Sequence, residues 1–127
     1  MKIAPLLHVG RGVTAIIGGG GKTTLMETLA GELSKKGKVI ITTTTHICRP
    51  KQYETLLDAD EAAVSAALER SGIVCVASQA ESGKLCAPRL SMGTLAQLAD
   101  FVLVEADGAK PVSYTHLRAH ETVLDLV

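Results

Sequence analysis

The sequence has 127 residues, 46% hydrophobic and 20% charged, so we expect one small globular domain and exclude a disordered chain. Its 13 basic and 13 acidic residues cancel, whereas a general nucleic-acid binder is usually basic. No apolar run is long enough to cross a membrane, and 3 cysteines with no close pair favour a reducing cytoplasm over a disulfide framework.

The first half of the chain predicts two strands with a helix between them. Residues 13–17 form a β-branched apolar run that stops at four glycines, as a buried strand entering a turn would. From Lys22 the apolar residues recur at helical spacing, and Gly37 is expected to end that helix. Residues 39–41 open a second buried strand, which four threonines close.

The second half continues the alternation. The acidic segment 58–60 offers an N-cap for a helix that runs through Arg70 and ends at Gly72. A strand at 73–77, a hairpin-like turn at 81–84, a short helix at 94–99 and a strand at 101–104 follow. This order predicts an α/β fold with a mostly parallel sheet, flanked by helices on both faces because the apolar runs lack polar alternation.

A phosphate loop is predicted between the first strand and the first helix. Glycines let a phosphate approach the backbone closely, and successive N–H groups with the helix N-terminus face the anion. Lys22 would reach the terminal phosphates, Thr23 would give a hydroxyl to Mg²⁺, and Thr24 would bond a phosphate nearer the nucleoside. The predicted nucleotide-binding residues are Gly18, Gly19, Gly20, Gly21, Lys22, Thr23 and Thr24.

This loop departs from the standard P-loop. The pattern G-x-x-x-x-G-K-[ST] would need a glycine where Ile16 stands, and the chain instead fits the shorter G-x-x-G-K-T-T. The shorter loop resembles that of Mur-type ligases and folylpolyglutamate synthases. It also resembles the deviant loop of the MinD and nitrogenase iron protein group, but Ile17 replaces the signature lysine. The alternative is a glycine-rich turn that only connects strand to helix.

Two acidic residues follow the last predicted strand. A carboxylate at the carboxyl end of a buried parallel strand, beside a phosphate loop, is where Mg²⁺ is held. Glu105 or Asp107 would hold the metal, and the other would orient an attacking water or a substrate. The alternative is an acid pair on the surface. Lys22, Glu105 and Asp107 are therefore the catalytic candidates.

The threonine run lies at the same predicted edge of the sheet. Thr44 or Thr45 would join the shell of Mg²⁺ or of the γ-phosphate, and the alternative is that threonine simply suits strands. The predicted metal ligands are Thr23, Thr44 and Asp107. His46 and Cys48 are soft ligands two positions apart, but one His and one Cys do not complete a metal site.

Residues 112–122 match one reading frame of a transposon adapter used in sequencing libraries. We therefore expect residues 1–111 to be a partial P-loop NTP-binding domain, incomplete at its C-terminus, and residues 112–127 to be a non-native tail. His116 and His120, with Glu121 alongside, have the helical spacing of a metal pair, and the adapter frame accounts for that spacing.

Segments 13–24, 39–47 and 101–110 together resemble the YqeC family, over nearly all of residues 12–110. The resemblance implies a P-loop-like fold and a role in maturing selenium-dependent molybdenum hydroxylases, with such a hydroxylase or its cofactor as partner. It carries over to residues 18–24, to residues 42–45, and to Glu105, Asp107 and Gly108. In the family a Pro-Leu-Lys-type segment continues the chain, and this sequence departs at Pro111.

These features predict a protein that binds ATP or GTP with Mg²⁺, in the form of an NTP hydrolase or an NTP-dependent transferase. One alternative is a nucleotide-gated binding module with no turnover of its own, which the same residues would serve. Another is a fragment of a Mur-type ATP-dependent ligase, suggested by the short loop, but 127 residues leave no room for the amino-acid-binding domain of such an enzyme.

Overall fold

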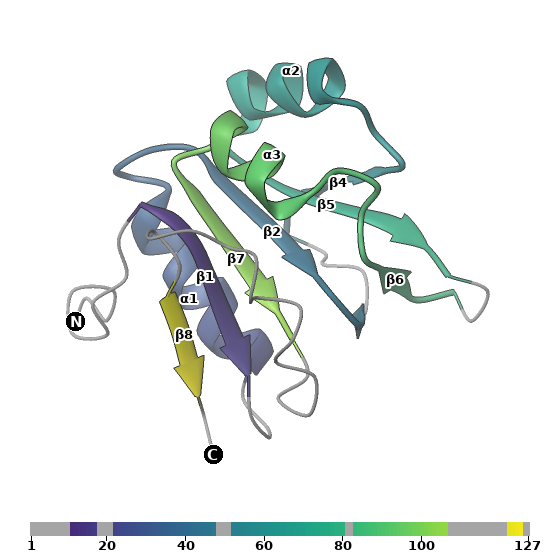
Figure 1. The fold of residues 1–127 in the computed structure, drawn as a ribbon. Coiled ribbons are helices and arrows are strands. Elements are labelled where there is room, and N and C mark those ends of the chain that lie inside the picture. The colour runs from purple at the N-terminus through teal and green to yellow at the C-terminus, as the bar shows by residue number, and fades with distance from the viewer. Residues whose placement is uncertain (1–10, 18–21, 48–51, 81–82, 107–121, 126–127) are drawn as a thin grey trace.

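The computed structural model of the chain describes residues 11–17, 22–47, 52–80, 83–106 and 122–125. Within these residues, three helices flank one curled, mostly parallel sheet (Figure 1). The helices are α1 (Lys22–Leu33), α2 (Glu61–Ser71) and α3 (Met92–Leu98). The strands are β1 (Gly12–Ile17), β2 (Val39–Thr43), β3 (His46–Ile47), β4 (Glu54–Leu57), β5 (Ile73–Gln79), β6 (Leu85–Cys86), β7 (Phe101–Glu105) and β8 (Thr122–Asp125).

The strand order brings segments together that are distant in the sequence. The sheet runs β3-β6-β5-β2-β7-β1-β8, with β4 paired to β5. The pairs β1–β7, β2–β7, β2–β5, β4–β5 and β1–β8 are parallel, and β3–β6 and β5–β6 are antiparallel. β7 thus lies between β1 and β2, so the strand before the predicted phosphate loop neighbours the strand that carries Glu105. The α/β prediction is confirmed.

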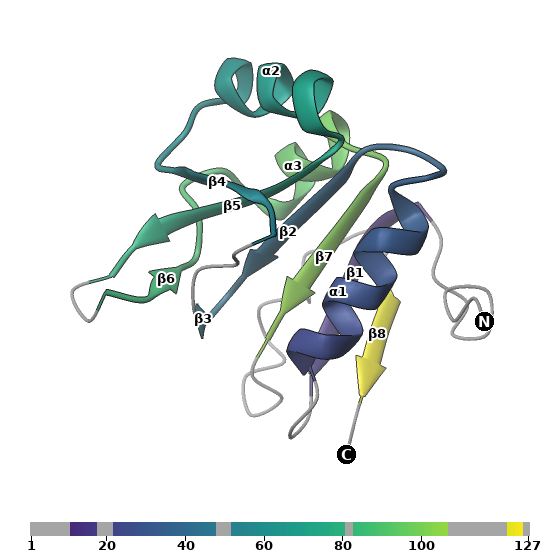
Figure 2. The same cartoon turned by 180° about the vertical axis from the view of Figure 1, so that it is seen from behind.

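Both faces of the sheet are covered, as the apolar runs predicted. α1 packs on one face, and α2 and α3 pack on the other (Figures 1 and 2). Tyr53 lies at the margin of the α1 cluster, where burial and then the Glu27 carboxylate raise the pKa of its phenol. The buried residues of the α1 cluster are Ile16, Met26, Leu29, Ala30, Leu33, Val39, Ile41, Phe101 and Leu103.

Local signals define α2. The Asp60 carboxylate accepts a hydrogen bond from the Ala63 N–H at 2.9 Å, which satisfies one of the N–H groups that a helix start leaves unpaired. Gly72 ends the helix at φ 79°, a left-handed conformation that glycine adopts without strain. The N-cap within 58–60 and the stop at Gly72 are both confirmed.

Other elements differ from the prediction. α3 begins at Met92, capped by Ser91, two residues before the expected start. β2 extends to Thr43, so half of the threonine run is strand. The short strands β3 and β4 were not predicted, because they are only 2 and 4 residues long and take their form from pairing with a neighbour. β6 pairs antiparallel with β5, as expected for a hairpin with its turn at 81–84.

Asp100 ties together the beginnings of three strands. Its carboxylate accepts a hydrogen bond from the Lys38 backbone N–H at 2.9 Å and pairs with the Arg11 guanidinium. Arg11 immediately precedes β1, Lys38 precedes β2, and Asp100 itself precedes β7. The Lys38 N–H lowers the pKa of the Asp100 carboxyl, Arg11 lowers it further, and partial burial opposes them.

The position of the Asp100 side chain requires glycine at residue 37. A Cβ on Gly37 would lie 2.2 Å from Oδ2 and 2.7 Å from Cγ of Asp100, which its partners hold in place. We expect Gly37→Ala to lower the free energy of unfolding by about 1–3 kcal/mol, measured by urea denaturation. Gly31→Ala is the matched control, because apart from its chain neighbours and the backbone of its own helix no atom lies within 4 Å of the added Cβ. Because Gly31 lies in the interior of α1, Gly31→Ala should leave the free energy of unfolding unchanged or raise it by up to about 1 kcal/mol. A Gly37→Ala protein as stable as wild type would contradict this requirement.

The lowered pKa of Asp100 predicts a pH dependence of stability. Because the folded protein binds this proton more weakly than the unfolded chain, the carboxylate stabilises the fold above its ordinary pKa of 3.8. That contribution is lost as the pH falls from this value through the folded pKa. We therefore expect the stability gap between wild type and Asp100→Asn, from urea titrations at a series of pH values, to shrink below that pH. A gap that stays constant with pH would contradict this assignment.

Candidate functional site

Three neighbouring strands end at the same edge of the sheet. β1, β7 and β2 are parallel and paired in that order, and α1 begins at the edge where they end (Figure 2). Ile16 of β1 is the register partner of Glu105 of β7, and Glu105 is the register partner of Thr43 of β2. The carboxyl edge of an open α/β sheet is where ligands bind. The glycine loop, the acidic end and the threonine run therefore all connect to this edge.

The Glu105 side chain belongs to the face that α1 covers. Register partners on parallel strands point to the same face, and Ile16 packs in the α1 cluster. Glu105 is half-buried on that face, and Thr43 beside it is buried. A carboxylate in this position can accept a proton from a nucleophile or contribute an oxygen to a hard cation such as Mg²⁺.

The backbone of Glu105 joins the three strand ends. Its carbonyl oxygen accepts hydrogen bonds from the Thr43 hydroxyl at 2.9 Å and from the Thr44 N–H at 3.1 Å. The next residue, Ala106, donates its N–H to the Ile16 carbonyl at 3.0 Å. Ala106 is fully buried and packs against Ala15. Glu105 is thus held at a defined place relative to β1 and β2.

The four threonines have different surroundings. Thr42 and Thr43 are buried strand residues, and the Thr42 hydroxyl donates to the Val76 carbonyl of β5 at 2.7 Å. Thr44 and Thr45 are half-buried in the bend after β2. The strand-propensity alternative therefore accounts for the first two threonines, while the metal role predicted for Thr44 stays a prediction. Sequence reasoning missed Thr43, whose signal is a threonine directly before a bend, where its hydroxyl can accept the N–H two residues later.

Several predicted site residues lie outside the described part of the chain. These are Gly18, Gly19, Gly20, Gly21 and Asp107, together with the side chains of Lys22 and Thr23. The backbone of Lys22, Thr23 and Thr24 forms the first turn of α1, where the N–H groups cannot bond within the helix. Thr24 is exposed. The nucleotide-binding and catalytic roles of these residues stay predictions.

The cysteines and His46 form no complete metal site in the described chain. His46 and Cys86 are register partners in the β3–β6 pair, a neighbour relation that the sequence did not show. Within the described residues no group of three or more His, Cys, Asp or Glu side chains could hold a metal ion. Cys75 is buried in a small apolar cluster, and Cys48, His116 and His120 lie outside the described residues.

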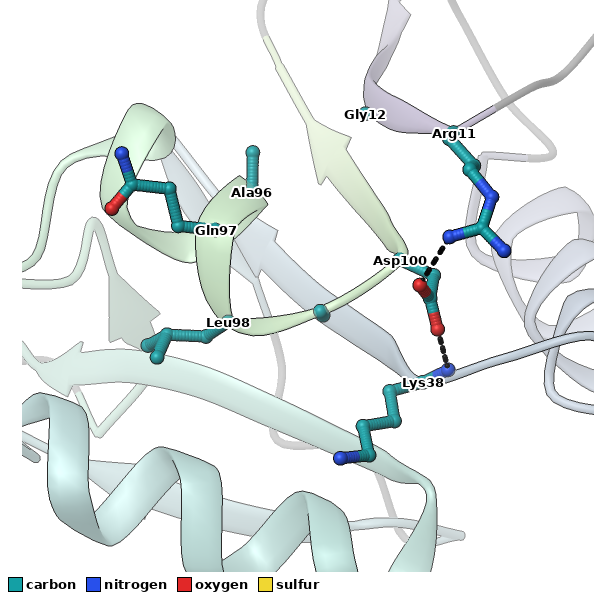
Figure 3. A pocket seen from close by; sticks show the side chains of 8 residues that line it. Arg11, Gly12, Lys38, Ala96, Gln97, Leu98 and Asp100 are labelled. Carbon is teal, nitrogen blue, oxygen red and sulfur yellow. Dashed lines mark hydrogen bonds and ion pairs between the residues drawn. The ribbon is translucent and has the colours of Figure 1, made fainter.

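A pocket of about 490 Å³ lies at the opposite edge of the sheet, around the start of β7 (Figure 3). Its charged lining residues are Arg11, Lys38 and Asp100, which already bond to one another or to Glu69. The pocket is therefore separate from the strand ends that carry Glu105 and the threonine bend. Among the described residues, no helix is long and apolar enough to span a membrane.

A family model described as YqeC protein matches residues 14–125. The match covers β1 from Thr14 onward, the whole order of helices and strands that follows it, and the residues of the candidate site. No curated protein and no solved structure matches the chain.

Proposed function

Because the chain belongs to the YqeC family, we propose that it is an Mg²⁺-NTP-binding accessory factor in the maturation of selenium-dependent molybdenum hydroxylases. The observation that supports nucleotide binding is the meeting of three features at one sheet edge. Glu105 lies on the face covered by α1, the threonine bend is bonded to its carbonyl, and α1 begins at the sheet edge where β1 and β7 end. A glycine run directly before such a helix suits a phosphate.

We propose a role for each residue from its chemistry. The N–H groups of residues 18–21 would face the phosphates, and Lys22 would reach the terminal ones. Thr23, Thr44 and Asp107 would hold Mg²⁺ through oxygen atoms, the ligands this ion prefers, and bound Mg²⁺ would offset the charge of the phosphates. Glu105 would orient an attacking water or acceptor group, because a half-buried carboxylate can take up its proton.

Calorimetric titration with ATP and with GTP, each with and without Mg²⁺, tests this proposal. We expect saturable, Mg²⁺-dependent binding of at least one nucleotide. Phosphate release that saturates with NTP, in the absence of any partner, would favour an NTP hydrolase or an NTP-dependent transferase. Binding without turnover would make it a gated binding module for the hydroxylase or its cofactor. Absence of binding for both nucleotides would refute the proposal.

We infer that residues 112–127 derive from a library adapter, as their reading frame indicates. β8 lies within this segment and pairs with β1, and the family match also extends to residue 125. An exposed strand edge offers unpaired N–H and C=O groups to any extended segment within reach, so this pairing does not depend on where the segment comes from.

The adapter origin predicts a difference at the DNA level. Sequencing unfragmented source DNA across the codons for Lys110 to Val127 should show that the reading frame diverges after Pro111. Recovery of the same codons from that template would refute the adapter origin. His116 and His120 would then be native residues, and a metal titration would follow.

A further inference from the structure

The geometry points to Thr43 as a positioning residue of the candidate nucleotide site. Its hydroxyl donates to the Glu105 carbonyl at 2.9 Å and accepts the Thr45 N–H at 3.0 Å. One buried hydroxyl therefore holds both the acidic strand end and the bend that carries Thr44 and Thr45. This inference rests on the proposed function, because it assigns the part that Thr43 takes in arranging that site.

The hydrogen-bond capacity of a hydroxyl explains why this position suits threonine. A hydroxyl has one donor and two acceptor positions, and Thr43 uses the donor toward β7 and one acceptor toward the bend. The second contact, from a threonine hydroxyl to the N–H two residues later, closes a turn that mimics a backbone turn. The methyl group keeps the β-branched shape that suits a strand.

The consequence is that Thr43 fixes the relative position of two proposed site residues, Glu105, which would orient the attacking water, and Thr44, which would hold Mg²⁺. Glu105 comes from β7, whereas Thr44 comes from the bend after β2. Thr44 also donates its N–H to the Glu105 carbonyl at 3.1 Å, so the same oxygen receives both bonds. Without the Thr43 hydroxyl, the Thr45 N–H loses this acceptor, whereas the Thr44 N–H keeps its bond to the Glu105 carbonyl.

The neighbouring residue supplies a matched control. Thr42 is also fully buried in β2, and its hydroxyl also donates to a backbone carbonyl of an adjacent strand, Val76 of β5 at 2.7 Å. Thr42 points to the opposite face and away from β7. Replacing either threonine with valine removes one buried hydroxyl and keeps the shape of the side chain. Only the change at Thr43 acts on the strand end and bend of the candidate site.

The test compares the affinities of fluorescent ATP and GTP analogues with Mg²⁺ and with EDTA, in variants whose folding is checked by circular dichroism. We expect Thr43→Val to weaken Mg²⁺-dependent binding by about tenfold and to change binding in EDTA by less than about twofold. Thr42→Val should stay within about twofold of wild type in both conditions. A general loss of stability would not produce this selective loss of the Mg²⁺ effect.

A second pair keeps the test valid where valine is not tolerated. Thr43→Ser and Thr43→Ala both lose the methyl group, and only serine keeps the hydroxyl, so serine should bind Mg²⁺-nucleotide about tenfold better than alanine. Equal affinities in this pair, or equal losses in Thr42→Val and Thr43→Val, would refute the positioning role. A wild-type protein that binds no nucleotide would instead refute the proposed function, and the role of Thr43 with it.

Discussion

Replacing Lys22 with alanine should weaken Mg²⁺-nucleotide binding by about 1.5–3 kcal/mol, roughly a 10- to 150-fold rise in Kd. The lysine begins α1 at the sheet edge where β1, β7 and β2 end, directly after the glycine run. Its ammonium group would bond to the terminal phosphates, and a hydrogen bond to a charged group is worth more than a neutral one. Calorimetric titration of both proteins with ATP and GTP in Mg²⁺ measures the difference.

The chain offers a control at the other end of the same helix. Lys36 is an exposed lysine in the turn that follows α1, far from the strand ends. Lys36→Ala removes the same charge from the protein, so a general electrostatic effect on an anionic ligand would appear in both variants. We expect Lys36→Ala to bind nucleotide as wild type does. Unchanged affinity in Lys22→Ala, or an equal loss in both variants, would contradict the phosphate loop.

Replacing Glu105 with glutamine should have the largest effect on turnover, if the protein hydrolyses or transfers the terminal phosphate. Glutamine has nearly the same shape but accepts a proton poorly, and general base catalysis contributes about 10²–10⁴-fold. We expect phosphate release to fall by about 100-fold or more, while the Kd for Mg²⁺-nucleotide changes much less. Single-turnover phosphate release and equilibrium titration on the same samples separate the two effects.

Asp100→Asn is the matched control for this change. Both acids flank β7, Glu105 at its carboxyl end and Asp100 immediately before its first residue. Asp100 bonds to Arg11 and to the Lys38 N–H at the opposite edge of the sheet, so its loss should alter acid stability and leave turnover at neutral pH unchanged. Full activity in Glu105→Gln would exclude Glu105 as the base and leave Asp107 as the candidate.

The local elements were predictable because their signals lie within a few consecutive residues. Apolar runs produced β1, β2, β5 and β7 close to the expected positions, and Asp60 and Gly72 begin and end α2 as predicted. Caps and hydrophobic periodicity act over one or two helical turns and need no distant partner. The phosphate-loop hypothesis has the same origin, since it depends on seven adjacent residues between a strand and a helix.

Features that depend on pairing between distant segments were not predictable. Gly37 was expected only to end a helix, yet it must be glycine because Asp100, 63 positions later, occupies the space of its Cβ. β3 and β4 are extended because a neighbouring strand satisfies their backbone groups. A short segment with no β-branched run does not reveal its partner.

The sequence by itself determined the alternation of strands and helices, the α/β class and the residues that belong to each candidate motif. Only the tertiary structure decided that β7 lies between β1 and β2, which brings Glu105 beside Ile16 and Thr43. It also separated the threonines into two that hold strands together and two that lie in the bend. The physical reason is that strand order and hydrogen-bond partners follow from the packing of the whole sheet between its helices. The pattern of adjacent residues does not specify which distant strands will pair.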